Sequence, residues 1–167
     1  SAISTRPIDF SSLGGVWNPC AGSVTPWGSH LGSEEYEPDA RHHDPATGRI
    51  DRKTAAMAAY YGGDVTRLNP YADGWPVEVT VDAEGGTQVA KRYAMGRVAL
   101  ELAYVMPDRR TAYLTDDGTN VGLYLFVADR EADLSAGTLY AARWNQRPEP
   151  VGSSGAGAAD LAWVHLG

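Results

Sequence analysis

The sequence contains a single cysteine, Cys20, so no disulfide bond can form within the chain. The redox state of its compartment therefore cannot be read from cysteine pairing. Basic residues are also few, with 14 Lys and Arg against 21 Asp and Glu and a formal net charge of −7. Because sequence-independent binding to nucleic acid needs basic patches, this balance argues against a nucleic-acid partner.

Long hydrophobic runs are absent as well. The stretch AAMAAYYGG at residues 55–63 is far too short to cross a bilayer, so we expect no membrane span. No signal peptide is recognisable at the N-terminus, and Ser1 is expected to begin a mature protein or a piece of a longer one. The sequence also has no Gly-x-Ser-x-Gly motif and no phosphate-cradling glycine loop, so neither of these sites is indicated.

The 167 residues predict one β domain, 1–167, with enough chain to bury a core. Short segments rich in β-branched and aromatic residues are separated by Gly, Asp, Asn or Pro, which is typical of strands. EGG at 84–86 and DGTN at 117–120 are predicted turns, the second with Gly118 available for positive φ. The predicted strands are 76–82, two within 87–106 that are broken at Gly96, 110–117, 121–129 and 137–144.

Two segments interrupt this pattern. Residues 36–66 are predicted to form a surface insertion with a short helix, for which Asp51 is a plausible N-cap and Gly62 with Gly63 a plausible stop. Residues 146–160 are a flexible loop by composition. Short strands with intervening turns, and aromatics near strand ends, fit a sandwich or a propeller.

Acidic residues gather after Cys20, at Glu34, Glu35, Glu37 and Asp39, and a second pair stands at a predicted strand end. Carboxylates at strand ends suit Ca²⁺, whereas a thiolate favours a transition metal, so together they suggest a site for more than one kind of metal. A solvated acidic loop and ordinary turn chemistry are the alternatives, and a lone cysteine is commonly a small buried apolar residue or a free thiol. The second pair is Asp116 and Asp117.

Glu101 lies in the otherwise apolar segment RVALELAYV. A carboxylate is costly to bury unless it is paired or coordinated, although strand alternation could equally point it to solvent. The adjacent His42 and His43 do not indicate zinc, because neighbouring histidines do not naturally face one ion and no second thiol supports them.

These residues resemble a known family. CAGSVTPWGSHLGSEEYEPDA, residues 20–40, is similar to the Cys-Ala-Gly, Thr-Pro-Trp-Gly and Glu-Glu signature of the PhoX-type alkaline phosphatases, a group of secreted bacterial proteins. The similarity continues, in the family's order, through DGWPVEVTVD at 73–82, the stretch 95–129 and DLSAGTLYAARW at 133–144. It thus extends over most of the chain.

The resemblance implies a six-bladed β-propeller, of which this mainly β chain supplies about three blades with one short helical insertion. It further implies a cluster of iron and calcium in the central channel, hydrolysis of phosphomonoesters, and a secreted or periplasmic location. A second chain, or another copy of this one, would complete the propeller. By position, Cys20 would bind iron, and the cluster carboxylates would come from Glu34, Glu35, Glu101, Asp116 and Asp117.

The chain departs from the family in two places. Leu100 precedes Glu101 where the family usually has histidine, and the chain stops near the point where the family's second half, with its Arg-Pro-Glu motif, should begin. The RPE at 147–149 precedes a tryptophan strand and does not match that motif. Two functions therefore remain open: part of a metal-dependent phosphatase, whose isolated chain is inactive, or a noncatalytic surface or binding propeller that retains metal ligands.

Overall fold

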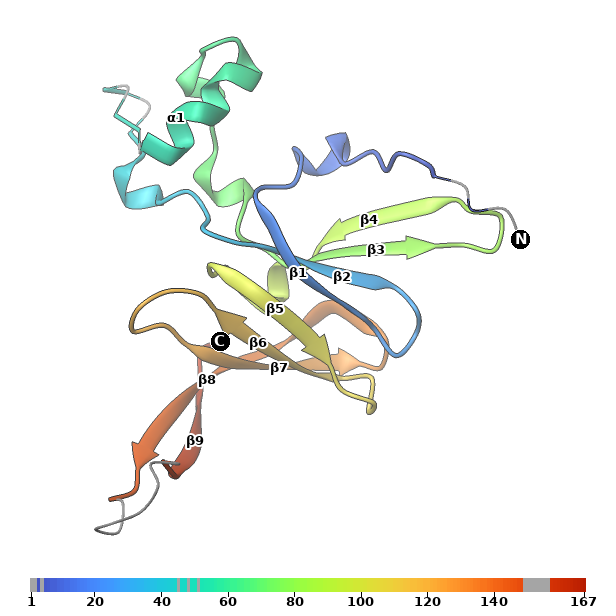
Figure 1. Cartoon of the computed structure of the whole chain (residues 1–167), viewed down its shortest axis with the longest axis vertical. Helices are drawn as coiled ribbons and strands as arrows, with labels where there is room; N and C mark the ends of the chain where they lie inside the picture. Colours follow the sequence, from blue (N-terminus) through green and yellow to red (C-terminus); the bar gives the residue numbers. More distant parts are fainter. Residues whose placement is uncertain (1–2, 4, 45, 48, 51, 149–156) are drawn as a thin grey trace.

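A computed structural model describes residues 3, 5–44, 46–47, 49–50, 52–148 and 157–167. They form two antiparallel sheets in which strands that follow one another in sequence lie side by side (Figure 1). The first sheet contains β1 (Pro19–Val24), β2 (His30–Glu34), β3 (Val77–Val81) and β4 (Thr87–Lys91). The second contains β5 (Leu100–Val105), β6 (Thr111–Asp116), β7 (Leu123–Arg130), β8 (Asp133–Gln146) and β9 (Ala159–His165).

The mainly β prediction is confirmed, and four-stranded up-and-down sheets are the unit from which propellers are built. The sequence predicts about three blades, and the described residues form two sheets. The difference arises because much of the chain between β2 and β3 is helix and loop. It also arises because β8 and β9 are long and form a hairpin that projects from the second sheet (Figure 1).

Strands with regular alternation were predictable from sequence, and two others were not. β3 to β8 correspond to predicted segments, and the break at Gly96 falls at the end of a short 3-10 helix, η6 (Tyr93–Met95). β9 was expected only as a tryptophan strand without bounds, and β1 and β2 were not predicted. β1 and β2 contain proline or glycine, which weaken a strand pattern, but Pro19 is tolerated because it is the first residue of an edge strand.

The segment between β2 and β3 contains the single α-helix of the described residues, α1 (Arg52–Ala58), and it makes an excursion to one side of the first sheet (Figure 1). The helical segment ends at Gly62, whose φ of 67° is left-handed, as the sequence predicts. The proposed N-cap, Asp51, and residues 149–156 of the 146–160 loop lie outside the described residues. No described helix is long and apolar enough to cross a membrane. The remaining short 3-10 helices are η1 (Ser11–Leu13), η2 (Ala40–His42), η3 (Ala59–Tyr61), η4 (Val65–Arg67) and η5 (Pro70–Ala72).

The hydrophobic core lies against the second sheet and joins it to the first. Leu31 of β2 is fully buried among apolar side chains of β5 to β8, including Leu114 and Phe126. A hydrogen bond from Ser23 Oγ of β1 to the carbonyl oxygen of Ala103 in β5, 2.7 Å long, fixes the two sheets at their contact. This packing brings β1 beside β5, where the candidate site is found.

The TPWG turn that joins β1 to β2 is held by a buried carboxylate. Glu78 of β3 accepts hydrogen bonds from Trp27 Nε1 (2.8 Å) and from the hydroxyl of Ser29, and it pairs with Arg92 Nε at 2.7 Å. Gly28 supplies the left-handed φ of 87° that the turn requires. Glu78 therefore ties this turn to β3 and to Arg92, the residue that follows β4.

Candidate metal centre

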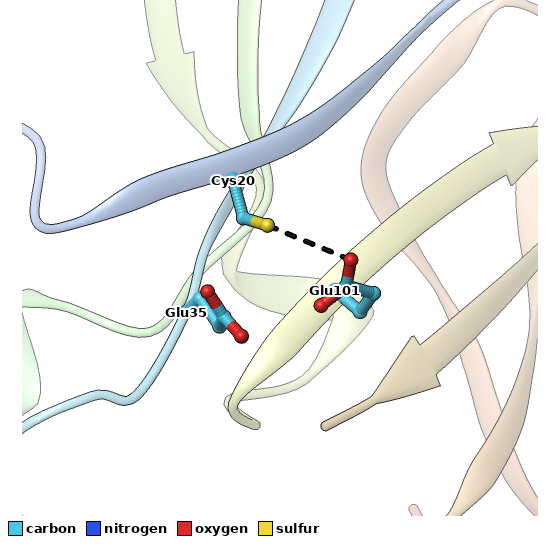
Figure 2. A group of neighbouring side chains, drawn as sticks. All are labelled: Cys20, Glu35 and Glu101. Carbon is cyan, nitrogen blue, oxygen red and sulfur yellow. Dashed lines mark hydrogen bonds between the residues drawn. The ribbon is translucent and has the colours of Figure 1, made fainter. Parts of the chain in front are cut away.

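Three predicted site residues converge at the contact between the two sheets. Each of Cys20, Glu35 and Glu101 offers one ligand atom. These three atoms all lie within 4.8 Å of one another. Cys20 Sγ is 3.5 Å from Glu101 Oε1, and Figure 2 shows the three side chains directed toward one another. Cys20 comes from β1, Glu35 directly follows β2, and Glu101 comes from β5, so neither sheet alone contains the site.

Two β-bulges lie at this cluster. The register of β1 on β2 shifts between Pro19 and Gly22, around Cys20, and that of β5 on β6 shifts between Leu100 and Leu102, at Glu101. A bulge inserts an extra residue into one strand and changes the direction in which its side chains point. Simple alternation along 97–105 therefore could not have decided whether Glu101 faces solvent or the site.

Asp117 and Tyr36 extend the cluster. The Tyr36 hydroxyl donates a hydrogen bond to Asp117 Oδ2, and Asp117 is also hydrogen-bonded to Glu35. The bond from Tyr36, followed by that from Glu35, holds the pKa of Asp117 below its usual value. The same contact with Asp117 raises the pKa of Tyr36 to about 12. Tyr36 was not predicted as a site residue, and its position between Glu35 and Glu37 was the one signal of it in the sequence.

The electrostatics of the cluster are those of acidic groups placed close together. Desolvation raises the pKa of the Cys20 thiol, and hydrogen bonds with Glu35 and Glu101 add to this. Desolvation also raises the pKa of Glu35, reinforced by its hydrogen bond to Asp117. A bound cation reverses such shifts, because it favours the ionised form of every group that contacts it. A thiol with carboxylates is a donor set that fits transition-metal and calcium ions together.

The other two predicted ligands have different surroundings. Glu34 is fully buried and forms an ion pair with Lys91, with 2.9 Å between Oε1 and Nζ. Asp116 is the last residue of β6, and burial raises its pKa. Its Oδ1 is buried without a hydrogen-bond partner among the described residues. The structure thus brings together Cys20, Glu35, Glu101 and Asp117, and it does not bring Glu34 to them.

The histidine pair takes no part in this cluster. His42 Nδ1 lies 3.4 Å from Asp39 Oδ2, and His43 Nδ1 is buried without a hydrogen-bond partner among the described residues.

A cavity of about 1230 Å³ opens beside the cluster. Glu35 and Tyr36 form part of its wall, and η1, the following loop, α1, η3 and Asp73 supply the rest. Most of the side chains there are apolar or aromatic, so the cavity could receive an organic group whose charged end reaches Glu35. Its apolar and aromatic lining residues are Val16, Trp17, Tyr36, Met57 and Tyr61.

Comparison with known proteins gave two matches. A family model described as alkaline phosphatase PhoX matches residues 3–167. Among solved structures, the chain is similar to Pseudomonas fluorescens PhoX in complex with vanadate, a transition state analogue, with 26% identity and a TM-score of 0.60. The match covers 91% of this chain and 30% of that one, so the chain spans less than a third of that protein's length. No curated protein sequence matches it.

Proposed function

The chain belongs to the alkaline phosphatase PhoX family, and from this membership we propose that it is the metal-holding part of a phosphomonoester hydrolase built on a β-propeller. The observation that carries the proposal is the convergence of Cys20, Glu35 and Glu101 from two sheets. The solved relative binds vanadate, which is described as a transition state analogue. Such analogues bind where an enzyme stabilises its transition state, which supports phosphoryl chemistry as the reaction class.

We assign iron to the Cys20 thiolate and calcium to the oxygens of Glu35, Glu101 and Asp117, which is the assignment that the family resemblance implies. Sulfur and oxygen donors divide between these ions by their softness. Ions of this kind supply electrostatic stabilisation of the charge that develops on a phosphoryl group during in-line displacement. Asp116, with a buried and unpartnered Oδ1 in the described structure, stays a predicted ligand.

The residues of the chain itself hold and orient these groups. Tyr36 donates to Asp117 and so keeps this carboxylate ionised and directed toward Glu35. The cavity beside Glu35 would receive the alcohol portion of a phosphomonoester, while the phosphate lies at the cluster. The proposed substrates are therefore small phosphomonoesters.

A positively charged clamp for the phosphate would have to come from elsewhere. Arg97, one of the arginines near the proposed ligands in sequence, donates instead to the carbonyl oxygens of Asp73, Pro38 and Pro70. Arg41 pairs with Asp39. The phosphoryl oxygens accumulate charge in the transition state. A site without such a clamp therefore stabilises the transition state poorly and accelerates the reaction little. We therefore propose that the 167-residue chain alone has little activity, and that further sequence, a second chain or another copy completes the propeller, in a secreted or periplasmic setting.

The test compares this chain with a longer parent that continues through an Arg-Pro-Glu segment, on p-nitrophenyl phosphate with and without a calcium chelator. Elemental analysis of both proteins accompanies the assay. We expect calcium-dependent turnover by the parent and little by the short chain. A parent that binds iron and calcium fully but has no activity would instead favour the noncatalytic binding propeller. Robust turnover by the short chain would contradict the proposal that this chain lacks the positively charged clamp.

A further inference from the structure

A group of buried charges surrounds Glu34, the residue that precedes Glu35. Lys91, the last residue of β4, has a side chain with no exposed surface. Its Nζ lies 2.9 Å from Glu34 Oε1, 3.0 Å from Asp73 Oδ1 and 2.7 Å from the carbonyl oxygen of Ala72. A lysine ammonium has three donors, so all of them are used.

Glu34 is the centre of this group. Its Oε1 also accepts a hydrogen bond from the backbone nitrogen of Trp17 (2.7 Å), and its Oε2 accepts from those of Gly74 (3.0 Å) and Trp75 (3.1 Å). One carboxylate thus connects the end of β2, the end of β4, the loop before β3 and the segment that enters β1.

Two short segments link these hydrogen bonds to the cluster of Cys20, Glu35 and Glu101. Glu35 directly follows Glu34, and its backbone nitrogen donates to the carbonyl oxygen of Asn18 at 3.2 Å. Asn18 Nδ2 returns a bond of 3.1 Å to the Glu35 carbonyl oxygen, and Trp17 Nε1 donates to that of Tyr36 at 2.8 Å. Segment 17–18, which leads to Cys20, is thereby fastened to segment 34–36, which contains Glu35.

Both segments contain a residue with positive φ. Asn18 has a φ of 34° and Tyr36 a φ of 50°, in a region that residues other than glycine seldom occupy. For a bulky residue such as tyrosine, this conformation persists only when surrounding contacts hold it. Glu34, which Lys91 pairs, is placed to do so, since it lies two residues before Tyr36 and accepts from the backbone nitrogen of Trp17, the residue before Asn18.

We propose that Glu34, Lys91 and Asp73 are positioning residues for the metal centre: they fix the backbone on either side of Glu35 and Cys20 so that both side chains reach the same ion. The inference rests on the proposed metal binding. The adjacent glutamates then have different roles, since the Glu34 side chain is buried against Lys91 while Glu35 lies beside Cys20 and Glu101. Glu34 anchors the backbone from inside, and Glu35 faces the metal.

The buried charges of this group serve to position the backbone more than to stabilise the fold. An ion pair buried in this way is commonly no more stabilising than apolar residues of similar volume, because desolvation of the ions offsets their attraction. Ionic hydrogen bonds are, however, strongly directional and fix a backbone more tightly than apolar packing does. A role in positioning therefore explains the group better than a role in stability alone.

The experiment measures binding of Co²⁺ to the whole 167-residue chain, followed by the absorption that cobalt gains from a thiolate ligand. In Glu34→Gln the side-chain amide cannot accept from both Lys91 and the two backbone nitrogens, so the anchor is weakened without a large change of volume. We expect the dissociation constant for Co²⁺ to rise about 10–100-fold, as is usual when a residue that orients a metal ligand is lost. Asp73→Asn, which keeps an acceptor for Lys91, provides a milder variant and a smaller rise.

Glu78→Gln is the matched control. Glu78 is an equally buried carboxylate on the neighbouring strand, paired with Arg92, and it does not precede a cluster residue. We expect it to change the dissociation constant by less than about threefold, whatever its effect on unfolding. Equal loss of affinity in Glu78→Gln and Glu34→Gln, or wild-type affinity in both Glu34→Gln and Asp73→Asn, would overturn the proposal.

A second measurement needs no metal. The Glu35 amide bonds to Asn18, so its hydrogen exchange reports directly whether the two segments remain fastened. We expect faster exchange at Glu35 in Asp73→Asn and Glu34→Gln than in Glu78→Gln at matched stability. Failure of the wild-type chain to bind Co²⁺ would count against the proposed function, while unchanged exchange at Glu35 would count against the positioning role.

Discussion

Cys20 Sγ lies 3.5 Å from Glu101 Oε1, although the two residues are 81 positions apart and belong to different sheets. Contact between β1 and β5 is therefore what creates the site. Ser23, which bonds to β5 from the same strand as Cys20, helps to hold this contact at 2.7 Å.

Replacement of Cys20 by serine should abolish thiolate–cobalt absorption and weaken Co²⁺ binding. The loss should exceed the roughly 10–100-fold that follows removal of an outer partner, because a direct ligand is gone. Absorption titration with Co²⁺ measures both effects. Ala21→Ser, which adds a hydroxyl at the next position and keeps the thiol, is the control. Unchanged spectra and affinity in Cys20→Ser would remove Cys20 from the site.

Tyr36→Phe should raise the pKa of Asp117. The hydrogen bond from Tyr36 is the largest cause of the lowered pKa of this carboxyl, and phenylalanine cannot donate it. A lowered folded-state pKa contributes stability above the ordinary value of 3.8 that is lost as pH falls through the folded value. The variant should therefore lose less stability on acidification than the wild type.

The measurement for Tyr36→Phe is an NMR titration of the Asp117 carboxyl carbon in the metal-free chain, with Tyr71→Phe as control. The Tyr71 side chain is largely exposed, and its ring contact with Arg97 would survive the change. An Asp117 pKa that does not move in Tyr36→Phe would show that the hydrogen bond is not maintained in solution.

Trp27→Phe should destabilise the fold by about 1–3 kcal/mol, since it removes the indole donor to the buried carboxylate of Glu78. Urea unfolding followed by circular dichroism measures the change. Trp144→Phe, at a side chain that is 58% exposed, should stay within about 0.5 kcal/mol of the wild type. Equal effects of the two changes would mean that the TPWG turn does not depend on Glu78.

Gly137→Ala should destabilise the second sheet by about 1–3 kcal/mol through overpacking. An added Cβ would lie 2.4 Å from Cζ of the fully buried Phe126 and 2.5 Å from the Val127 carbonyl oxygen, neither of which can move freely. In Gly32→Ala the closest atom, at 3.0 Å, belongs to the exposed ring of His30, so the cost should be smaller. Thermal unfolding of both variants measures the two losses of stability. A larger loss in Gly32→Ala than in Gly137→Ala would contradict the prediction.

The β8–β9 hairpin should promote association of the chain with another copy. β9 is the edge strand of its sheet, and exposed apolar side chains such as Trp144 and Leu161 lie on the hairpin. Unpaired strand edges and apolar patches both favour association. Light scattering after size-exclusion chromatography should give a mass above 17.9 kDa that falls in Leu161→Glu but not in Val81→Glu, which alters an exposed residue of the other sheet. A wild-type monomer at all concentrations would refute this.

Part of the fold could be predicted from the sequence because β3 to β8 follow local patterns of strand and turn formation. Alternating apolar positions, β-branched residues and turn glycines act over a few neighbouring residues, and Gly118 adopts the positive φ that the DGTN turn predicts. β1 and β2 escaped prediction because their Pro, Gly and Ser residues have weak strand propensity. Pairing with β3 and packing of Leu31 make them strands, and both are interactions with distant parts of the chain.

The same division holds at the site. Residue chemistry drew attention to Cys20 and the acidic pairs, and the family resemblance was needed to assign them as metal ligands. The sequence could not decide whether Glu34 or Glu35 lies beside Cys20 and Glu101. Their relative placement depends on the bulges at Cys20 and Glu101, and on Lys91, a buried residue far along the chain that pairs with Glu34. Side-chain direction is a property of strand register, and register is set by the pairing of distant strands, which only the folded chain contains.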